Sequence, residues 1–196
     1  DGTYDEKERI NQEECDYMLN LLKELSDTPQ HTYPKIGFAC ATVEQRNLFA
    51  SQLLKIKQSR SKAADKIKHL ERNGMGVYQF EELAGQQFDI LIISFTFGPL
   101  NVAGDLTQDI NYFMHLEGEK MLQNLLNTGI QQVKIVNSIS LTKVSEWSKD
   151  KDKKAFGHYA TNAPLVRQAS KELSDEVDRI WDLMTTGAGD EFDEEK

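Results

Sequence analysis

The stretch that decides the fold is "FDILIISF", which runs from Phe88 to Phe95. It is short, rich in β-branched residues, and apolar at consecutive positions instead of alternate ones. A strand that is apolar on both faces is typical of the centre of a parallel sheet with helices on both sides. The run therefore predicts a central parallel strand and, with it, a layered α/β domain.

Three other short apolar runs predict further strands of the same sheet. They are "KIGFACATV" (35–43), "GVYQF" (76–80) and "VKIVNSI" (133–139). Helical periodicity separates these runs and extends over much of 110–130, and it also marks the segment 11–25 before the first strand. In that first helix, Asn11 is the expected N-cap and Glu14 the expected partner in a capping box. The alternation predicts an α/β sandwich with a mostly parallel sheet.

Composition restricts the class of protein further. The 196 residues are 39% hydrophobic and 28% charged, which suits one sizeable soluble domain. No apolar run approaches the roughly 18 residues of a membrane span, and no signal peptide opens the chain, so a cytoplasmic protein with no membrane partner is expected. Because the first residue is Asp1, we expect a piece of a longer protein. Cys15 and Cys40 are expected to be reduced and buried, and the scattered histidines predict no metal site.

The charge distribution leaves two interpretations open. A net charge of −9 disfavours nucleic-acid binding over the whole surface. However, seven lysines and arginines fall within the single helical stretch from Lys55 to Arg72. They form either a solvated helix surface or a contact surface for phosphate groups.

Few residues form a recognisable catalytic or ligand-binding motif. Ligands of open parallel sheets bind outside the carboxyl ends of the strands, so we expect a site among the loops that begin near Thr42, Phe80, Phe95 and Ile139. The chain has no GxxxxGK[ST] motif and no Ser-His-Asp or Cys-His arrangement, so no catalytic residue is predicted. Asp89, Asp105 and Asp109 are interpreted as solvated caps.

The order of the segments from Asp1 to about Leu141 resembles the second RecA-like domain of superfamily 1 helicases, in the group of the nonsense-decay helicase and related bacterial DNA helicases. "YDEKERINQEECDYMLNLLKEL" is similar to the segment that opens the family's domain. "KIGFACATVEQRNLFASQLLKI" resembles motif IV, with Thr42 and Gln45 as the candidate residues.

"VYQFEELAGQQFDILIIS" resembles motif V, which in the family couples the ATP cleft to the nucleic-acid track. Ala84 and Gln87 replace the family's glutamine and glutamate there. "FGPLN" (97–101) resembles the loop that leaves this strand in the bacterial subgroup. The resemblance makes candidates of Gly85, Gln87, Asp89 and Ser94 in motif V and of Gly98 and Asn101 in the loop.

In the family, this loop leads to motif VI, whose arginines reach across the cleft to the γ-phosphate of the nucleotide. Here "MLQNLLNTGI" (121–130) stands in that place, and Met121, Thr128 and Ile130 fall at the three arginine positions. Lys120 is adjacent but cannot form the bidentate fork of an arginine. Losing an arginine finger lowers the rate of phosphoryl transfer by roughly 10³–10⁵-fold.

The resemblance implies a RecA-like, P-loop NTPase-type domain at 1–141. The polar helical pattern that follows predicts a helical extension at 142–184, and the Gly-rich, acidic end predicts a disordered tail or linker at 185–196. One function it implies is the C-terminal motor domain of an ATP-dependent DNA or RNA helicase, acting with an upstream RecA-like domain that carries Walker motifs. The other is a helicase-derived scaffold or nucleic-acid-binding module that no longer hydrolyses ATP. An unrelated doubly wound domain with a small-molecule site stays a third alternative. Single-stranded DNA or RNA is the implied partner, and an active parent protein would use ATP and Mg²⁺, with neither expected to bind this piece alone.

Overall fold

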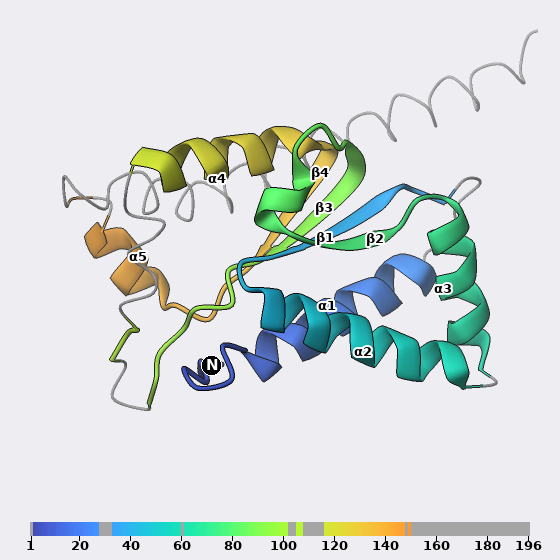
Figure 1. The fold of residues 1–196 in the computed structure, drawn as a ribbon, viewed down its shortest axis with the longest axis horizontal. Coiled ribbons are helices and arrows are strands. Elements are labelled where there is room, and N and C mark those ends of the chain that lie inside the picture. The colour runs from blue at the N-terminus through green and yellow to red at the C-terminus, as the bar shows by residue number, and fades with distance from the viewer. Residues whose placement is uncertain are drawn as a thin grey trace, which may run out of the picture.

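A computed structural model describes residues 2–27, 33–59, 61–101, 105–107, 116–147 and 149. Four strands form one sheet in the order β2-β1-β3-β4, and every neighbouring pair is parallel (Figure 1). The strands are β1 (Ile36–Cys40), β2 (Gly76–Gln79), β3 (Phe88–Ser94) and β4 (Gly129–Val136). The predicted α/β sandwich with a parallel sheet is therefore confirmed.

The central position of β3 is also confirmed. It pairs with β1 from Ile36↔Ile90 to Cys40↔Ser94 and with β4 on its other side. All of β1 is buried, and so is β3 except at Asp89. Because β2 and β3 lie on opposite sides of β1, the strand order reverses there, and the loops after β1 and β3 diverge at the carboxyl edge of the sheet.

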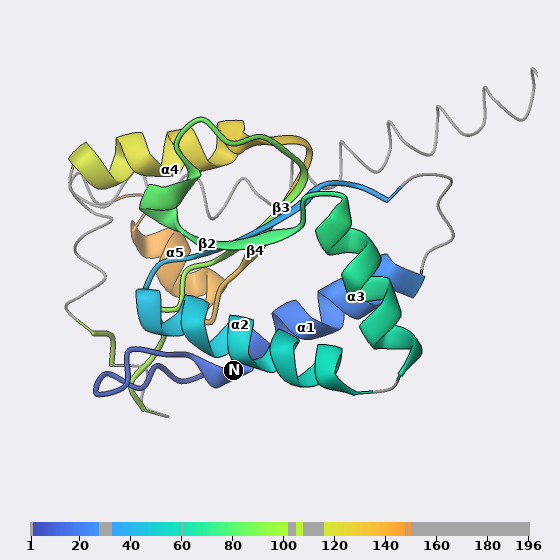
Figure 2. The ribbon, with the colours of Figure 1, turned by 45° about the vertical axis from the view of Figure 1, so that its right-hand side comes forward.

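Helices cover both faces of the sheet (Figures 1 and 2). On one face lie α1 (Gln12–Asp27), α2 (Val43–Gln58) and α3 (Lys62–Arg72). On the other lie the 3₁₀ helix η1 (Phe80–Leu83) and α4 (Leu116–Thr128), with α5 (Leu141–Trp147) beside them. No helix in the described ranges has both the length and the apolar character that a bilayer crossing needs.

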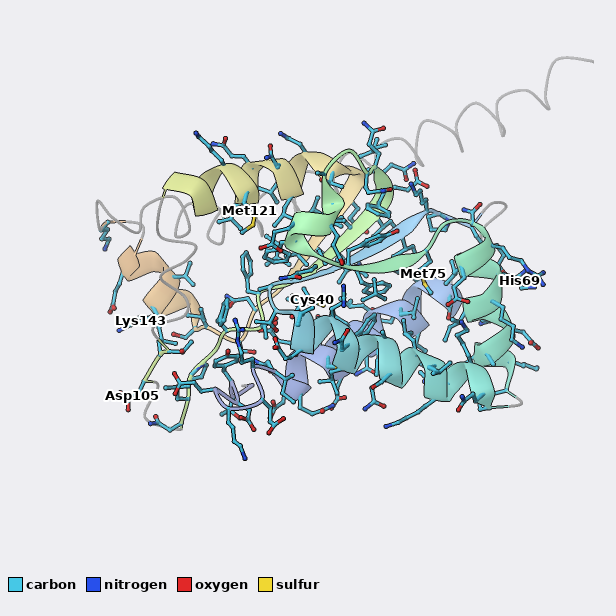
Figure 3. All side chains as sticks on the ribbon, viewed as in Figure 1. Cys40, His69, Met75, Asp105, Met121 and Lys143 are labelled. Atoms are coloured by element: carbon cyan, nitrogen blue, oxygen red, sulfur yellow. The ribbon has the colours of Figure 1, made fainter. Side chains whose placement is uncertain are left out.

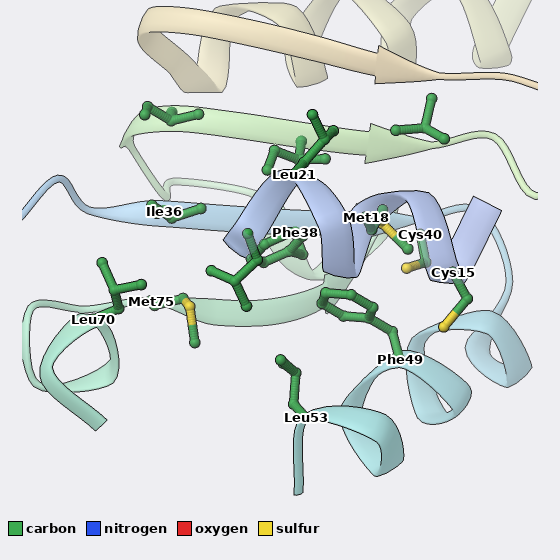
Figure 4. Close-up of a cluster of buried hydrophobic side chains, with 14 of the residues drawn as sticks. Cys15, Met18, Leu21, Ile36, Phe38, Cys40, Phe49, Leu53, Leu70 and Met75 are labelled. Carbon is green, nitrogen blue, oxygen red and sulfur yellow. The ribbon is translucent and has the colours of Figure 1, made fainter. Parts of the chain in front are cut away.

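Each face of the sheet has its own hydrophobic core. Phe38 and Phe49 meet at the centre of the core under α1–α3, with ring centroids 4.6 Å apart. Cys15 and Cys40 are free and fully buried in the same core (Figure 4), as the sequence predicted. Burial raises the pKa of the Cys15 thiol to about 12, so it is protonated at neutral pH. Leu91 of β3 belongs to the other core, against α4 and η1.

The structure differs from the sequence-based expectation at β4. The prediction started this strand at residue 133 and assigned residues up to 130 to a helix, whereas α4 ends at Thr128 and β4 begins at Gly129. β4 lies at the end of the strand order, and Ile130 is 62% exposed, so its first residues lack the buried pattern of a central strand. Residues 110–115 of the expected helix, most of the expected extension at 142–184 and the tail lie outside the described residues.

Candidate functional site

Buried polar side chains gather at the carboxyl edge of the sheet, near the point where the strand order reverses. Three of the sequence-predicted candidates meet there, Thr42 and Gln45 after β1 and Ser94 at the end of β3, and all three are buried. Asn11 and Glu14, at the start of α1, complete the group. The motif IV and motif V candidates of this edge are therefore parts of one network.

Glu14 is the centre of this network. Its Oε2 accepts hydrogen bonds from the Ser94 hydroxyl (2.6 Å) and the Thr96 backbone N–H (2.9 Å). Its Oε1 accepts from the backbone N–H and the hydroxyl of Ser138, both at 3.0 Å. Burial raises the pKa of Glu14 to about 7, although the four hydrogen bonds lower it. One carboxyl group thus joins the first turn of α1 to the ends of β3 and β4.

The predicted capping box is only half correct. Asn11 Oδ1 does accept from the Glu14 backbone N–H, at 3.1 Å. The Asn11 backbone N–H, however, donates to Gln45 Oε1 (2.8 Å), while Gln45 Nε2 donates back to the Asn11 carbonyl (2.9 Å). The side chain of Gln45 thus replaces that of Glu14, because Glu14 points into the protein interior instead of back along its own helix.

Thr96 holds a strained backbone next to this network. Its φ is 65°, a left-handed conformation that is unusual for a β-branched residue. The Phe97 backbone N–H donates to the Phe95 carbonyl at 2.6 Å, which closes a tight turn centred on Thr96. The turn aims the Thr96 N–H at Glu14, so the strain and the buried carboxyl group belong to the same arrangement.

The "FGPLN" segment packs on the same network. A Cβ atom on Gly98 would lie 3.0 Å from Ser138 Cβ and 3.1 Å from Asn11 Nδ2, so a side chain here would require these neighbours to shift. The Pro99 carbonyl accepts from the Tyr4 backbone N–H at 2.9 Å. The ring of Tyr4 also meets that of Phe97 edge-on, with centroids 5.3 Å apart. The segment therefore holds the N-terminal residues around Tyr4 against the edge of the sheet.

The other candidates take part in local structure. Asp89 lies at the opposite, amino edge of the sheet, where its Oδ2 accepts from the Lys35 backbone N–H at 2.7 Å. Asn101 and Asp105 bond to each other within the loop after β3. Asp89 and Asp105 thus take part in local structure, with Asp89 half-buried instead of solvated, and Asp109 lies outside the described residues.

The remaining motif V candidates line an open hollow of about 730 Å³ between η1 and α4. Gly85 and Gln87, which immediately precede β3, form one wall. Met121 and Thr128, two of the positions where the family carries arginine, form the other wall together with Lys120. Ile130, the third position, lies just beyond the hollow at the start of β4. The segments that resemble motifs V and VI therefore meet, although they are not neighbours in the sequence.

The described side chains of this hollow offer few groups that suit a nucleoside triphosphate. Among the described residues that line it, Lys120 is the one cation, and Glu81 is an acid on the opposite side. The Thr128 hydroxyl donates to the Asn124 carbonyl of its own helix at 2.8 Å. Met121 points from α4 toward the sheet and packs against the core (Figure 3). Nor do three or more His, Cys, Asp or Glu side chains come together as metal ligands anywhere in the described ranges.

Sequence reasoning missed the partners of Glu14. Thr96 and Ser138 carry no motif that predicts their role, since each contributes a backbone N–H that any residue possesses. The one available signal was an acid in the first turn of a helix, and that pattern normally indicates a solvent-exposed cap.

Comparison with known proteins identifies no family: no protein-family model matches the chain, and no curated protein matches it.

Proposed function

We propose that this chain is the C-terminal RecA-like domain of a superfamily 1 helicase-related protein, and that it serves there as a scaffold or nucleic-acid-binding module without supporting ATP hydrolysis. One observation carries the proposal. The hollow between η1 and α4 brings the motif V candidates Gly85 and Gln87 beside Met121 and Thr128, where arginines are expected in the family. The arrangement suits helicase ancestry, and its chemistry suits a domain that has lost its contact with the γ-phosphate.

The absence of guanidinium groups matters because phosphoryl transfer depends on electrostatic stabilisation of the transition state. Met121 is half-buried and apolar, and the hydroxyl of Thr128 is engaged within α4. Lys120 is exposed and offers a point charge, which cannot reproduce the planar fork of arginine. We therefore expect a rate deficit of roughly 10³–10⁵-fold relative to an intact arginine finger.

A second candidate function is the motor domain, which would act with an upstream Walker-motif domain that holds ATP and Mg²⁺. The meeting of the motif V and motif VI segments on one surface favours it, because that surface is where a second domain would complete the cleft. In this alternative, Lys120 supplies the positive charge that the described lining of the hollow contributes.

ATP hydrolysis by the natural full-length protein distinguishes the two candidates. ATP turnover is measured with and without single-stranded DNA and single-stranded RNA, and binding of each nucleic acid is measured on the same samples. If the proposal is right, the protein binds single-stranded DNA or RNA, and neither nucleic acid stimulates ATP turnover. Stimulated turnover near the typical enzyme value of about 10 s⁻¹ would refute the proposal and establish the motor.

Restoring an arginine tests the assignment of the hollow itself. Met121→Arg places a guanidinium group on the hollow, whereas the matched control Gln123→Arg places one on an exposed position of α4 that does not line it. If the hollow faces a nucleotide on the upstream domain, Met121→Arg raises stimulated turnover and Gln123→Arg leaves it unchanged. Equal turnover in both variants would contradict the alignment with motif VI.

A further inference from the structure

The charge of this acidic protein is divided very unevenly along the chain. Between Lys55 and Arg72, seven lysines and arginines face two acids, which gives a net charge of +5. The whole chain carries −9, so the rest of it carries −14. A polyanion that approaches the protein is therefore repelled by most of the chain and attracted by the end of α2 and by α3.

Both acids in this stretch are already paired. Lys57 Nζ lies 2.7 Å from Glu71 Oε1, and this ion pair also joins the end of α2 to α3. Lys68 Nζ lies 3.3 Å from Asp65 Oδ1. Lys55, Lys62 and Arg72 are exposed, and no acid in the described ranges forms an ion pair with them. Their charges stay available to an outside partner.

Lys62 and Arg72 lie with His69 on the outer side of α3. Ala64, Ile67 and Leu70 are buried toward the core, so the helical period places Lys62, His69 and Arg72 on the opposite side. Arg72 lies one turn from His69, and Lys62 lies two turns away in the other direction. Figure 3 shows His69 pointing outward from α3.

An exposed aromatic ring lies among these charges. Tyr33, just before β1, stacks on His69 with nearly parallel rings whose centroids are 5.9 Å apart. The Asn73 side chain donates to the Tyr33 carbonyl, which fixes this segment to the end of α3. The Tyr33 side chain is nevertheless 41% exposed. An exposed large aromatic group held in place beside cations is the combination with which proteins bind single strands, through base stacking and phosphate contacts.

We propose that the surface formed by Tyr33, Lys62, His69 and Arg72 binds single-stranded nucleic acid, with a base stacked at Tyr33 and phosphates at Lys62 and Arg72. The aromatic pair favours a nucleic acid over an acidic peptide, because a peptide would need the charges alone. This site lies outside the hollow between η1 and α4, and its residues are independent of the proposed helicase ancestry.

Fluorescence anisotropy with labelled oligothymidine and oligouridine of about 20 nucleotides tests the site on the whole 196-residue chain. For single strands, log K falls with log salt by about 0.7 per phosphate contact. At about 50 mM salt, each contact therefore contributes about eightfold, so Lys62→Gln/Arg72→Gln should weaken binding about 60-fold and reduce the salt slope by about 1.4. The control Lys7→Gln, on an exposed lysine of the N-terminal segment, should bind as the unmodified chain does.

Tyr33 variants test the stacking separately from the charge. Tyr33→Ala should weaken binding about 5- to 150-fold with an unchanged salt slope, and Tyr33→Phe should retain binding because it retains the ring. The site is refuted if the unmodified chain binds neither strand, or if the double glutamine variant binds as tightly as Lys7→Gln. Equal binding by Tyr33→Ala and Tyr33→Phe, or equal competition by a polyglutamate peptide of matched charge, would also overturn it.

Discussion

Replacing Glu14 by alanine should destabilise the fold more than replacing any other acidic residue of α1 by alanine. Four donors converge on the Glu14 carboxyl group at 2.6–3.0 Å. The hydroxyls of Ser94 and Ser138 can turn to other acceptors, but the backbone N–H groups of Thr96 and Ser138 cannot. A buried backbone N–H that is left without an acceptor costs about 1–3 kcal/mol. Glu14→Ala leaves two such groups and should therefore lower the free energy of unfolding by about 2–6 kcal/mol.

The pH dependence of this loss is a sharper test. Burial raises the pKa of Glu14 from its ordinary value of 4.5 to about 7, so the folded state binds the proton more tightly than the unfolded chain does. The resulting stability is fully present below about pH 4.5 and is lost as the pH rises to about 7. Its full extent is about 3 kcal/mol. The cost of Glu14→Ala should therefore be about 3 kcal/mol smaller at pH 8 than at the acid end of this range.

Urea unfolding, followed by circular dichroism at a series of pH values from about 4.5 to 8, measures both effects. Glu13→Ala is the matched control, because Glu13 is the neighbouring acid of the same helix turn and is exposed. It should cost less than about 1 kcal/mol, mainly through the helix dipole. A cost of Glu14→Ala equal to that of the control, or one that does not change between acid and alkaline pH, would refute the role assigned to the buried carboxyl group.

Three further stability predictions concern the surroundings of Glu14, each checked by urea unfolding. Thr96→Gly should be more stable than Thr96→Ala by about 1 kcal/mol, because only glycine relieves the left-handed backbone at φ 65°; the reverse order would contradict the strain. Gly98→Ala should cost about 1–3 kcal/mol, because its Cβ would lie 3.1 Å from Asn11 Nδ2. An unchanged urea midpoint of unfolding would contradict this close packing. Gln45→Leu should cost about 1–3 kcal/mol, because it leaves the buried Asn11 N–H without an acceptor while the Asn11 carbonyl keeps the Cys15 N–H as its donor; an unchanged free energy of unfolding would contradict that bridge.

The sequence predicted the helix cap and the strands well where the determining forces are local. Asn11 is the N-cap of α1, as its position before a helical run indicated, because capping depends on residues three positions apart. The same reasoning failed for the side chain of Glu14. Its acceptor role depends on Ser138, which lies 124 residues away, and no local pattern contains that information.

The sequence by itself determined the layers of this protein. The apolar run from Phe88 to Phe95 can be satisfied only between two covered faces, so burial alone made it a central strand and placed helices on both sides. Only the tertiary structure decided which side chains meet. The strand order brings Gly85 to Met121 across the hollow, and the packing of the segment before β1 on α3 brings Tyr33 onto His69. Hydrophobic periodicity is a property of neighbouring residues, whereas these contacts depend on strand order and register, which the chain acquires only when it folds.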